Sequence, residues 1–152
     1  MNKKLSIGGA FVGGHMKTFI TDKYQTAAVQ SIGRLVKHAS VLDESDSGVG
    51  HPFGKKVLAA LEEVLELCQE LGFKTFQDPE GYYGYAEIGE GEKLFGLLCH
   101  MDVVPAVDQA GWETDPFEMV ERDGLLIGRG TQDDKGPSMA ALYAVKALID
   151  AG

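Results

Sequence analysis

The sequence predicts an α/β domain built in layers, and three observations lead to this prediction. Helical patterns alternate with short strand patterns along the chain, as they do in layered α/β folds. Residues 94–99 form a nearly continuous apolar run, which is typical of a strand buried on both faces of a sheet. The 152 residues contain 44% hydrophobic side chains, which suffices for one packed domain or one piece of a larger domain.

Three helices are predicted from apolar residues that recur with the helical period. The first covers residues 24–38, and Thr21 or Asp22 can cap its N-terminus. The second covers residues 53–71 and is expected to end at Gly72, where glycine readily adopts a left-handed conformation. The third covers residues 137–151. The apolar stripe of the second helix is expected to contain Val57, Leu58, Leu61, Leu65 and Cys68, and that of the third Met139, Leu142, Val145 and Ile149.

Short strands are predicted between the helices. The segments with strand character are residues 73–77, 83–88, 94–99, 117–121 and 125–127. Asp123-Gly124 separates the last two, and this dipeptide is a strong signal for a β-hairpin. The apolar run at residues 94–99 ends at His100, so a buried strand is expected to deliver this histidine to its carboxyl end.

The N-terminal residues differ in character from the rest of the chain. Residues 1–16 are weakly apolar and glycine-rich, and Gly13-Gly14 leads into His15-Met16, which resembles a second start. A secretory signal would need a stronger apolar core and a small-residue cleavage site. We therefore predict that residues 1–16 are a tag or a disordered extension and that the domain occupies residues 17–152.

Charge and cysteine content limit the partners and the compartment. The formal net charge of −9 argues against nucleic-acid binding, which requires a basic patch. No apolar run approaches the roughly 20 residues that span a bilayer, so no membrane partner is expected. Cys68 and Cys99 match no disulfide framework and no thiolate metal motif, and both are predicted to be reduced, buried thiols of a cytoplasmic protein. The oligomeric state does not follow from these features.

His100 and Asp102 form the first candidate functional pair. In an extended segment, residues two apart point the same way, so both side chains can face one site. A neutral imidazole binds a metal through one nitrogen and needs a partner for the other, which a nearby carboxylate can supply. The alternative is a structural histidine beside a solvated aspartate.

Residues 128–137 form the second candidate segment. Three glycines leave room for unusual backbone angles around the adjacent carboxylates of Asp133 and Asp134. One carboxylate can bridge two metal ions, with one oxygen to each. The alternative is an ordinary helix start, in which Asp133 or Asp134 is the N-cap. The segment lacks the endings of a P-loop and of a dinucleotide fingerprint, which argues against nucleotide binding.

Together these segments resemble the co-catalytic zinc peptidase family, which includes aminoacylases, glutamate carboxypeptidases and carnosinase-like dipeptidases. Upstream, 51-HPFG-54 and 84-GYAE-87 are most similar to the bacterial Xaa-His dipeptidase branch. The resemblance runs from about the first helix to Gly152. The motifs that carry it are 100-HMDVVP-105, 111-GW-112, 115-DPF-117, 128-GRG-130 and 133-DDKGP-137.

The resemblance implies the N-terminal portion of a layered α/β/α catalytic domain with a mixed sheet, and it implies roles for individual residues. His100 would bind one metal ion, Asp133 would bridge two, and Asp102 would be the supporting catalytic acid. The peptide bond between Asp133 and Asp134 is expected to be cis. The metal would be Zn²⁺, two ions per complete site, with Mn²⁺ or Co²⁺ as alternatives. Trp112, Arg129 and Lys135 are expected to be structural, as are His15, His38 and His51.

The implied reaction is hydrolysis of the peptide bond of dipeptides by a metal-activated water. The family's catalytic Glu, its remaining ligands and its lid domain lie beyond the segment that the chain resembles. We therefore expect a fragment that is inactive alone. Two alternatives stay open: deacylation of N-acyl amino acids on the same site, and a non-catalytic binding module that reuses the fold.

Overall fold

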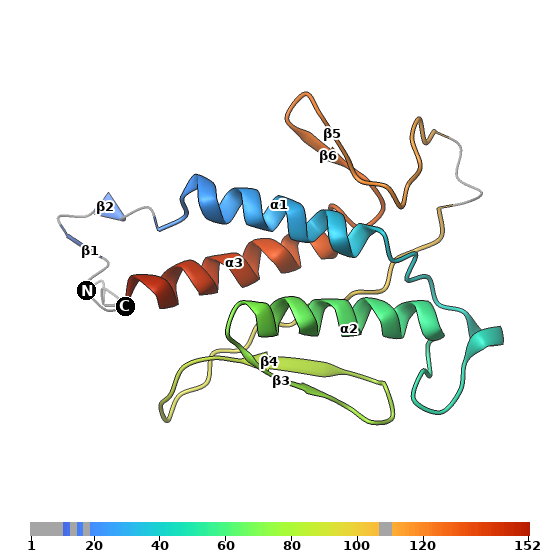
Figure 1. Ribbon diagram of the computed structural model, residues 1–152, viewed down its shortest axis with the longest axis horizontal. Helices are drawn as coiled ribbons and strands as arrows, with labels where there is room; N and C mark the ends of the chain where they lie inside the picture. The colour runs from blue at the N-terminus through green and yellow to red at the C-terminus, as the bar shows by residue number, and fades with distance from the viewer. Residues whose placement is uncertain (1–10, 13–14, 17–18, 107–110) are drawn as a thin grey trace, which may run out of the picture.

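The computed structural model describes residues 11–12, 15–16, 19–106 and 111–152, and three α-helices organise this part of the chain (Figure 1). Helices α1 (Asp22–Val36) and α3 (Lys135–Ala151) run side by side in opposite directions. Helix α2 (Lys55–Glu70) lies along α1, and a hairpin of β3 (Lys74–Gln77) and β4 (Gly84–Glu87) covers its other side.

The core lies where the three helices meet. Its buried apolar side chains are Ile32, Leu35 and Val36 of α1, Ala60 and Leu67 of α2, Met139 and Tyr143 of α3, and Met101. The buried hydroxyls of Ser31 and Tyr143 lie 2.8 Å apart and join α1 to α3 by a hydrogen bond. Met101 is the neighbour of His100, so the core fixes the segment that carries the candidate ligand.

The helix predictions are confirmed in position, but their apolar faces differ in part. Helix α2 contacts α1 through Ala60 and Leu67 and the hairpin through Leu65, so its apolar surface is wider than the single predicted stripe. In α3 the buried residues include Tyr143 and Ala147, whereas Ile149 is 45% exposed. The last turn of α3 extends past the core, so its predicted apolar stripe does not hold to the end.

The strands predicted on either side of residues 78–82 form a hairpin, and the hairpin predicted at Asp123-Gly124 forms as well. In the first, β3 and β4 pair antiparallel, with Phe76 opposite Tyr85. In the second, β5 (Val120–Arg122) pairs with β6 (Leu125–Ile127) through a turn at Asp123 and Gly124. Both turn residues have positive φ, 54° and 76°, as a type I′ turn requires. A short 3-10 helix, η1 (Glu44–Asp46), lies in the loop before α2.

The mixed sheet expected from the sequence is not formed by the described residues, whose strands make three separate two-stranded antiparallel sheets. The predicted strand at residues 94–99 has no strand partner among them. Leu94, Phe95 and Leu98 are 93%, 83% and 101% exposed. Cys99 is exposed as well, so the prediction of two buried thiols is wrong for Cys99 and correct for Cys68.

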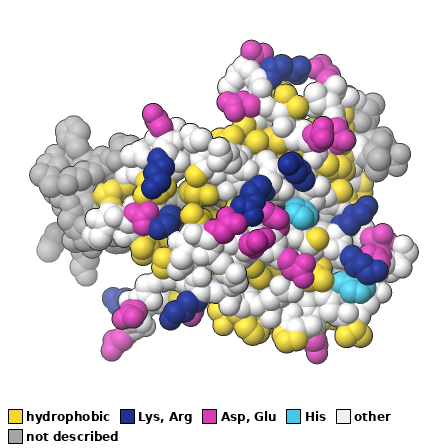
Figure 2. All heavy atoms as spheres, in the orientation of Figure 1, with side chains coloured by type: hydrophobic (Ala, Val, Ile, Leu, Met, Phe, Trp, Pro, Cys, Tyr) yellow, Lys and Arg dark blue, Asp and Glu magenta, His cyan; other side chains and the backbone are white. Residues whose placement is uncertain are grey.

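At the N-terminus, β1 (Phe11–Val12) pairs antiparallel with β2 (His15–Met16). The boundary at residue 17 and the tag remain predictions, and most of residues 1–16 lie outside the described residues. Among the described residues, no helix is long and apolar enough to cross a membrane. On the face shown in Figure 2, Lys and Arg side chains lie among Asp and Glu side chains.

Candidate metal centre

The segment that carries His100 and Asp102 is fastened to the chain just after α1. The hydroxyl of Ser40, a fully buried residue, donates to the carbonyl oxygen of Met101 at 2.6 Å. The carbonyl oxygen of Ser40 accepts from the amide of Val103 at 2.9 Å. Met101 and Val103 are buried, whereas His100 and Asp102 are exposed. The alternation of buried and exposed residues therefore turns both candidate side chains to the same side, as the spacing predicts.

The loop that carries Asp133 is folded tightly against the start of α3. The amide of Gly136 donates to the carbonyl oxygen of Gly130 at 3.1 Å. A Cβ atom at position 136 would lie 1.9 Å from the carbonyl oxygen of Thr131, so only glycine fits there. The peptide bond between Asp133 and Asp134 is cis, which confirms the expectation from the resemblance. Asp134 occupies the N-cap position of α3 without a side-chain capping bond.

The two segments bring His100 and Asp133 together. Nε2 of His100 lies 3.0 Å from Oδ1 of Asp133, although 33 positions separate the residues in the chain. Nδ1 of His100 lies 3.2 Å from Oδ1 of Asp102 and 3.2 Å from its carbonyl oxygen. The imidazole is therefore held between two carboxylates, one on each nitrogen. The side chains of His100, Asp102 and Asp133 are 48%, 59% and 84% exposed, so the group is open to solvent.

The carboxylates shift the protonation equilibrium of His100. Partial burial acts to lower the pKa of His100, but the hydrogen bond to Asp133 and the charges of Asp102 and Asp134 outweigh it. The net effect raises the pKa of His100 above its ordinary value. The surrounding carboxylates therefore favour a positive charge on the imidazole.

The donor atoms of His100 and Asp133 fit a divalent metal in kind and in spacing. Zinc binds imidazole nitrogen and carboxylate oxygen at about 2.1 Å, which places adjacent tetrahedral ligand atoms about 3.4 Å apart. The 3.0 Å between Nε2 and Oδ1 is close to this separation. Within the parts of the chain that the structure describes, no three His, Cys, Asp or Glu side chains are grouped to hold a metal ion. Among the described residues, His100 and Asp133 are thus two candidate donors.

An open groove of about 680 Å³ begins at Asp133 and follows β6. Trp112 lines it, and the guanidinium of Arg129 lies 5.3 Å from the centre of the Trp112 ring. Arg129 also donates to the carbonyl oxygen of Pro105 at 3.2 Å, so it ties the loop after Asp102 to the loop before Asp133. This contact agrees with the structural role expected for Arg129 and Trp112.

His38 and His51 have partners other than His100 and Asp133. Nε2 of His38 lies 3.4 Å from Oε2 of Glu63, and Nδ1 of His51 lies 2.9 Å from the carbonyl oxygen of Asp46. Both contacts are within the scaffold and agree with structural roles. The side chain of His15 lies outside the described residues.

Sequence reasoning missed two residues that support the site, Ser40 and Asp134. Oδ2 of Asp134 accepts from the amide of His100 at 3.3 Å and from the hydroxyl of Ser138 at 2.9 Å. This carboxylate links the two ligand segments directly. Ser40 carried no sequence signal, because its partner Met101 lies 61 positions away.

Comparisons with known proteins find similarity to peptidases. Residues 96–152 match the model of peptidase family M20/M25/M40. The provisionally named dipeptidase YtjP of Bacillus subtilis (strain 168) is 49% identical over 111 residues, which cover 73% of this chain and 23% of the relative. A protein from Staphylococcus haemolyticus with the same kind of name is 42% identical over 84% of this chain and 27% of its own length. The chain thus spans about a quarter of these relatives.

Two solved structures share the fold. Human carnosine dipeptidase 1 has a TM-score of 0.61 and 29% sequence identity, with 84% of this chain and 29% of the human chain covered. The dipeptidase Dug1p of Saccharomyces cerevisiae has a TM-score of 0.67 at 23% identity, over 86% of this chain and 30% of the yeast chain. These likenesses confirm the predicted zinc-peptidase-like α/β fold class.

In fold and in the matched segments, the chain is similar to proteins that are named dipeptidases. The part of the chain that is similar to peptidase family M20/M25/M40 is residues 96–152. The motifs from His100 to Pro137 lie inside the matched range, whereas 51-HPFG-54 and 84-GYAE-87 precede it.

Proposed function

We propose that this chain contributes to the hydrolysis of dipeptides, with His100 and Asp133 as metal ligands and Asp102 as the supporting catalytic acid. Zn²⁺ is the proposed metal, two ions per complete site, with Mn²⁺ and Co²⁺ as alternatives. Roughly three quarters of the length of the relatives has no counterpart in this sequence. The proposal therefore concerns the part of the site that these residues supply.

The single observation that carries the proposal is the approach of His100 to Asp133. Their donor atoms lie 3.0 Å apart, and each comes from a different segment of the fold. A structural histidine would be expected to lie inside the scaffold, as His38 does against Glu63. His100 instead points with Nε2 toward an exposed carboxylate beside an open groove.

Each proposed residue has a distinct task. Asp102 contacts Nδ1 of His100, which orients the ring and leaves Nε2 as the donor atom. Asp133 presents an 84% exposed carboxylate next to Nε2. A bound divalent metal would supply an activated water and polarise the carbonyl group of the peptide. The groove beside Asp133 leaves room for a small peptide substrate.

Zinc binding tests the ligand assignment. We expect isothermal titration of the chain with Zn²⁺ to show weak binding, because catalytic zinc sites generally use three protein ligands. His100→Ala and Asp133→Asn should each remove this binding. The matched control is His51→Ala, which also removes an imidazole but at a distance from the pair. Equal zinc affinity in the wild type and in His100→Ala would contradict the assignment.

Hydrolysis is tested in a chimera, in which this chain replaces the matched segment of the Bacillus subtilis relative. The chimera should release amino acids from dipeptides when zinc is present, and Asp133→Asn should abolish the release. Assays with N-acyl amino acids on the same chimera separate deacylation from peptide hydrolysis. Turnover that persists in Asp133→Asn would show that the catalytic role lies elsewhere.

The proposal includes a cytoplasmic location. Both cysteines are free thiols in the structure, and the relatives with dipeptidase names are bacterial proteins. Free thiols are the usual state of cysteine in the reducing cytosol.

A further inference from the structure

Both segments of the proposed metal site are fastened to the same short stretch of chain. This stretch is the last turn of α1 and the residues that follow it, residues 35–40, here named the α1 end turn. The segment of His100 attaches to it through Ser40, and the segment of Asp133 attaches through Lys135. The two positions that are attached, Met101 and Lys135, lie about 35 residues apart in the chain.

Ser40 holds the first segment on both sides of Asp102. Its hydroxyl donates to the carbonyl oxygen of Met101, and its carbonyl oxygen accepts from the amide of Val103. These bonds fix the backbone on either side of Asp102. Ser40 has no exposed surface, so water does not compete for the bonds.

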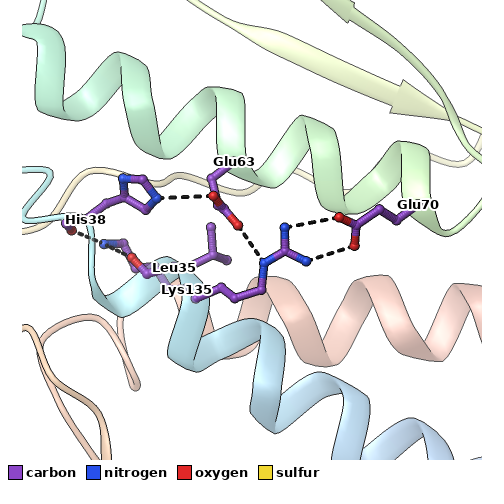
Figure 3. A network of polar contacts seen from close by, with 6 residues as sticks. Leu35, His38, Glu63, Glu70 and Lys135 are labelled. Atoms are coloured by element: carbon purple, nitrogen blue, oxygen red, sulfur yellow. Dashed lines mark hydrogen bonds and ion pairs between the residues drawn. The ribbon is translucent and has the colours of Figure 1, made fainter.

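Lys135 holds the second segment. Its side chain is fully buried, and Nζ donates to the carbonyl oxygens of Leu35 at 2.9 Å and His38 at 2.7 Å (Figure 3). The last carbonyls of a helix lack partners within the helix, and a cation is favoured near them. Burial lowers the pKa of Lys135 to about 8, so the amine still carries its charge at neutral pH. Lys135 follows Asp134 directly, so the bonds also fix the Asp133 loop.

A third contact joins the two attached segments. The carboxylate of Asp134 accepts from the amide of His100 and from the hydroxyl of Ser138. Gly130 adds a packing constraint, because a Cβ there would lie 3.0 Å from both Cδ of Lys135 and Cγ1 of Val103. Gly130, in the loop before Asp133, therefore packs against both the Lys135 side chain and Val103.

We propose that Ser40 and Lys135 are positioning residues that hold the segments of His100 and Asp133 on the α1 end turn and so set the separation of the two metal-binding atoms. This inference rests on the proposed function, since the separation matters only if these atoms bind a metal. Neither side chain bonds to His100 or Asp133 in the contacts described here; each acts through the backbone of a neighbour. Leu35 is fully buried in the core, which makes the end turn a rigid support.

The test uses two variants and one matched control. Ser40→Ala removes one hydroxyl, and Lys135→Met removes the charge while it keeps much of the side-chain volume. Arg34→Met is the control, because it also removes a cation from the α1 contacts but acts on Glu63 and Glu70 of α2. All three are made in the full chain, and folding is checked by thermal denaturation.

The first readout is the affinity for Zn²⁺ by isothermal titration. Loss of residues that support metal ligands typically weakens metal affinity about 10–100-fold, and we expect this range for Ser40→Ala and Lys135→Met. The control should stay within about twofold of the wild type, even if it lowers the melting temperature. The visible absorption spectrum of bound Co²⁺ should change in the two variants and stay unchanged in Arg34→Met.

The second readout, hydrogen exchange, needs no metal. Loss of Ser40 should speed exchange of the Val103 amide, and loss of Lys135 should speed exchange of the His100 amide, which bonds to Asp134. Exchange along α2 should stay unchanged. A purely structural role would instead raise exchange throughout the helices, in proportion to the loss of stability.

The outcomes separate this inference from the proposed function. If His100→Ala removes zinc binding but Ser40→Ala and Lys135→Met bind zinc as the wild type does, the positioning role is overturned. If the wild type and His100→Ala bind zinc alike, the proposed function fails. Hydrogen exchange of the Val103 and His100 amides then decides by itself whether the two segments are attached to the α1 end turn. If Lys135→Met does not fold, Ser40→Ala decides, because it removes only one hydroxyl.

Discussion

At the scale of single residues, the loop that carries Asp133 depends on a glycine that no other residue can replace. Gly136 approaches the carbonyl oxygen of Thr131 so closely that a Cβ atom would lie 1.9 Å from it. Gly72, at the end of α2, is a different case: its φ is 90°, and nothing lies within 4 Å of a Cβ built there. Position 136 requires glycine because a Cβ atom has no room there, whereas position 72 favours glycine only because its backbone is left-handed.

Gly136→Ala is therefore expected to destabilise the protein more than Gly72→Ala. The clash with a backbone atom must be relieved by moving the loop, at a cost of about 3 kcal/mol or more. Gly72→Ala forces a left-handed alanine without a clash, at a cost of about 1–2 kcal/mol. Urea denaturation monitored by circular dichroism measures both. Similar losses in the two variants would show that the close approach at Gly136 does not constrain the loop.

Local patterns in the sequence marked the proposed ligands as candidates, and the resemblance to a peptidase family supplied their roles. His100 and Asp102 are two apart in an extended segment, and the Asp133 loop is marked by its glycines. Ser40 and Asp134 were missed because their roles depend on partners 61 and 34 positions away. Long-range pairing of this kind leaves no periodic pattern in a single sequence.

At the scale of elements, α1 and α2 are joined by an ion-pair network around Arg34 (Figure 3). Its guanidinium donates to Glu63 at 2.7 Å and to Glu70 at 2.8 Å. The hydrogen bond to Arg34 is the main reason that the pKa of Glu70 is lowered, and the charge of Arg34 adds to it. Glu63 and Glu70 thus connect α2 to the neighbouring helix.

The Arg34–Glu70 pair should make stability depend on pH in the acid range. A lowered folded-state pKa means that the stabilisation is present above the unfolded pKa of Glu70 and is lost as pH falls through the folded value. Glu70→Gln should thus cost at most about 1 kcal/mol at neutral pH, since the pair is partly exposed, and nothing in strong acid. Urea denaturation at several pH values measures this difference. The control is Glu66→Gln, on the side of α2 that faces β3. Its difference in stability from the wild type should not change with pH in this way.

The packing of α3 gives a second test at this scale. Met139 is 1% exposed and belongs to the core, whereas Ile149 is 45% exposed although both were predicted on one apolar stripe. Met139→Ala should cost about 2–5 kcal/mol, as is usual for a buried methionine. Ile149→Ala should cost clearly less, because much of its side chain already contacts water. Thermal unfolding of the two variants decides, and equal losses would mean that the end of α3 is packed as tightly as its start.

Helices were easier to predict than strand pairing for a physical reason. An amphipathic helix satisfies its own backbone hydrogen bonds, so its pattern is enough to locate it. A strand needs a partner, and the apolar run at residues 94–99 specifies burial but not the partner. The hairpin of β5 and β6 was predicted correctly because its partner is supplied locally by the turn at Asp123-Gly124.

At the scale of the whole molecule, the helices bury the core, whereas an apolar segment outside the core is exposed to solvent. The three helices enclose the core, but residues 94–98 follow β4 as an exposed, extended segment. Exposed apolar segments with free backbone groups favour association. The formal net charge of −9 acts against it by repulsion between copies. The balance of these two effects is open to measurement.

We expect the double change Leu94→Lys and Leu98→Lys to reduce self-association, because it removes two of the most exposed apolar side chains. The change raises the formal net charge from −9 to −7, so weaker repulsion alone would increase association. A decrease can therefore be attributed to the loss of apolar surface. Light scattering over a concentration series measures the effect. Val49→Lys, at a single residue that is 98% exposed in a loop, is the control and should leave association unchanged. An unaltered concentration dependence in the double variant would show that residues 94–98 do not drive association.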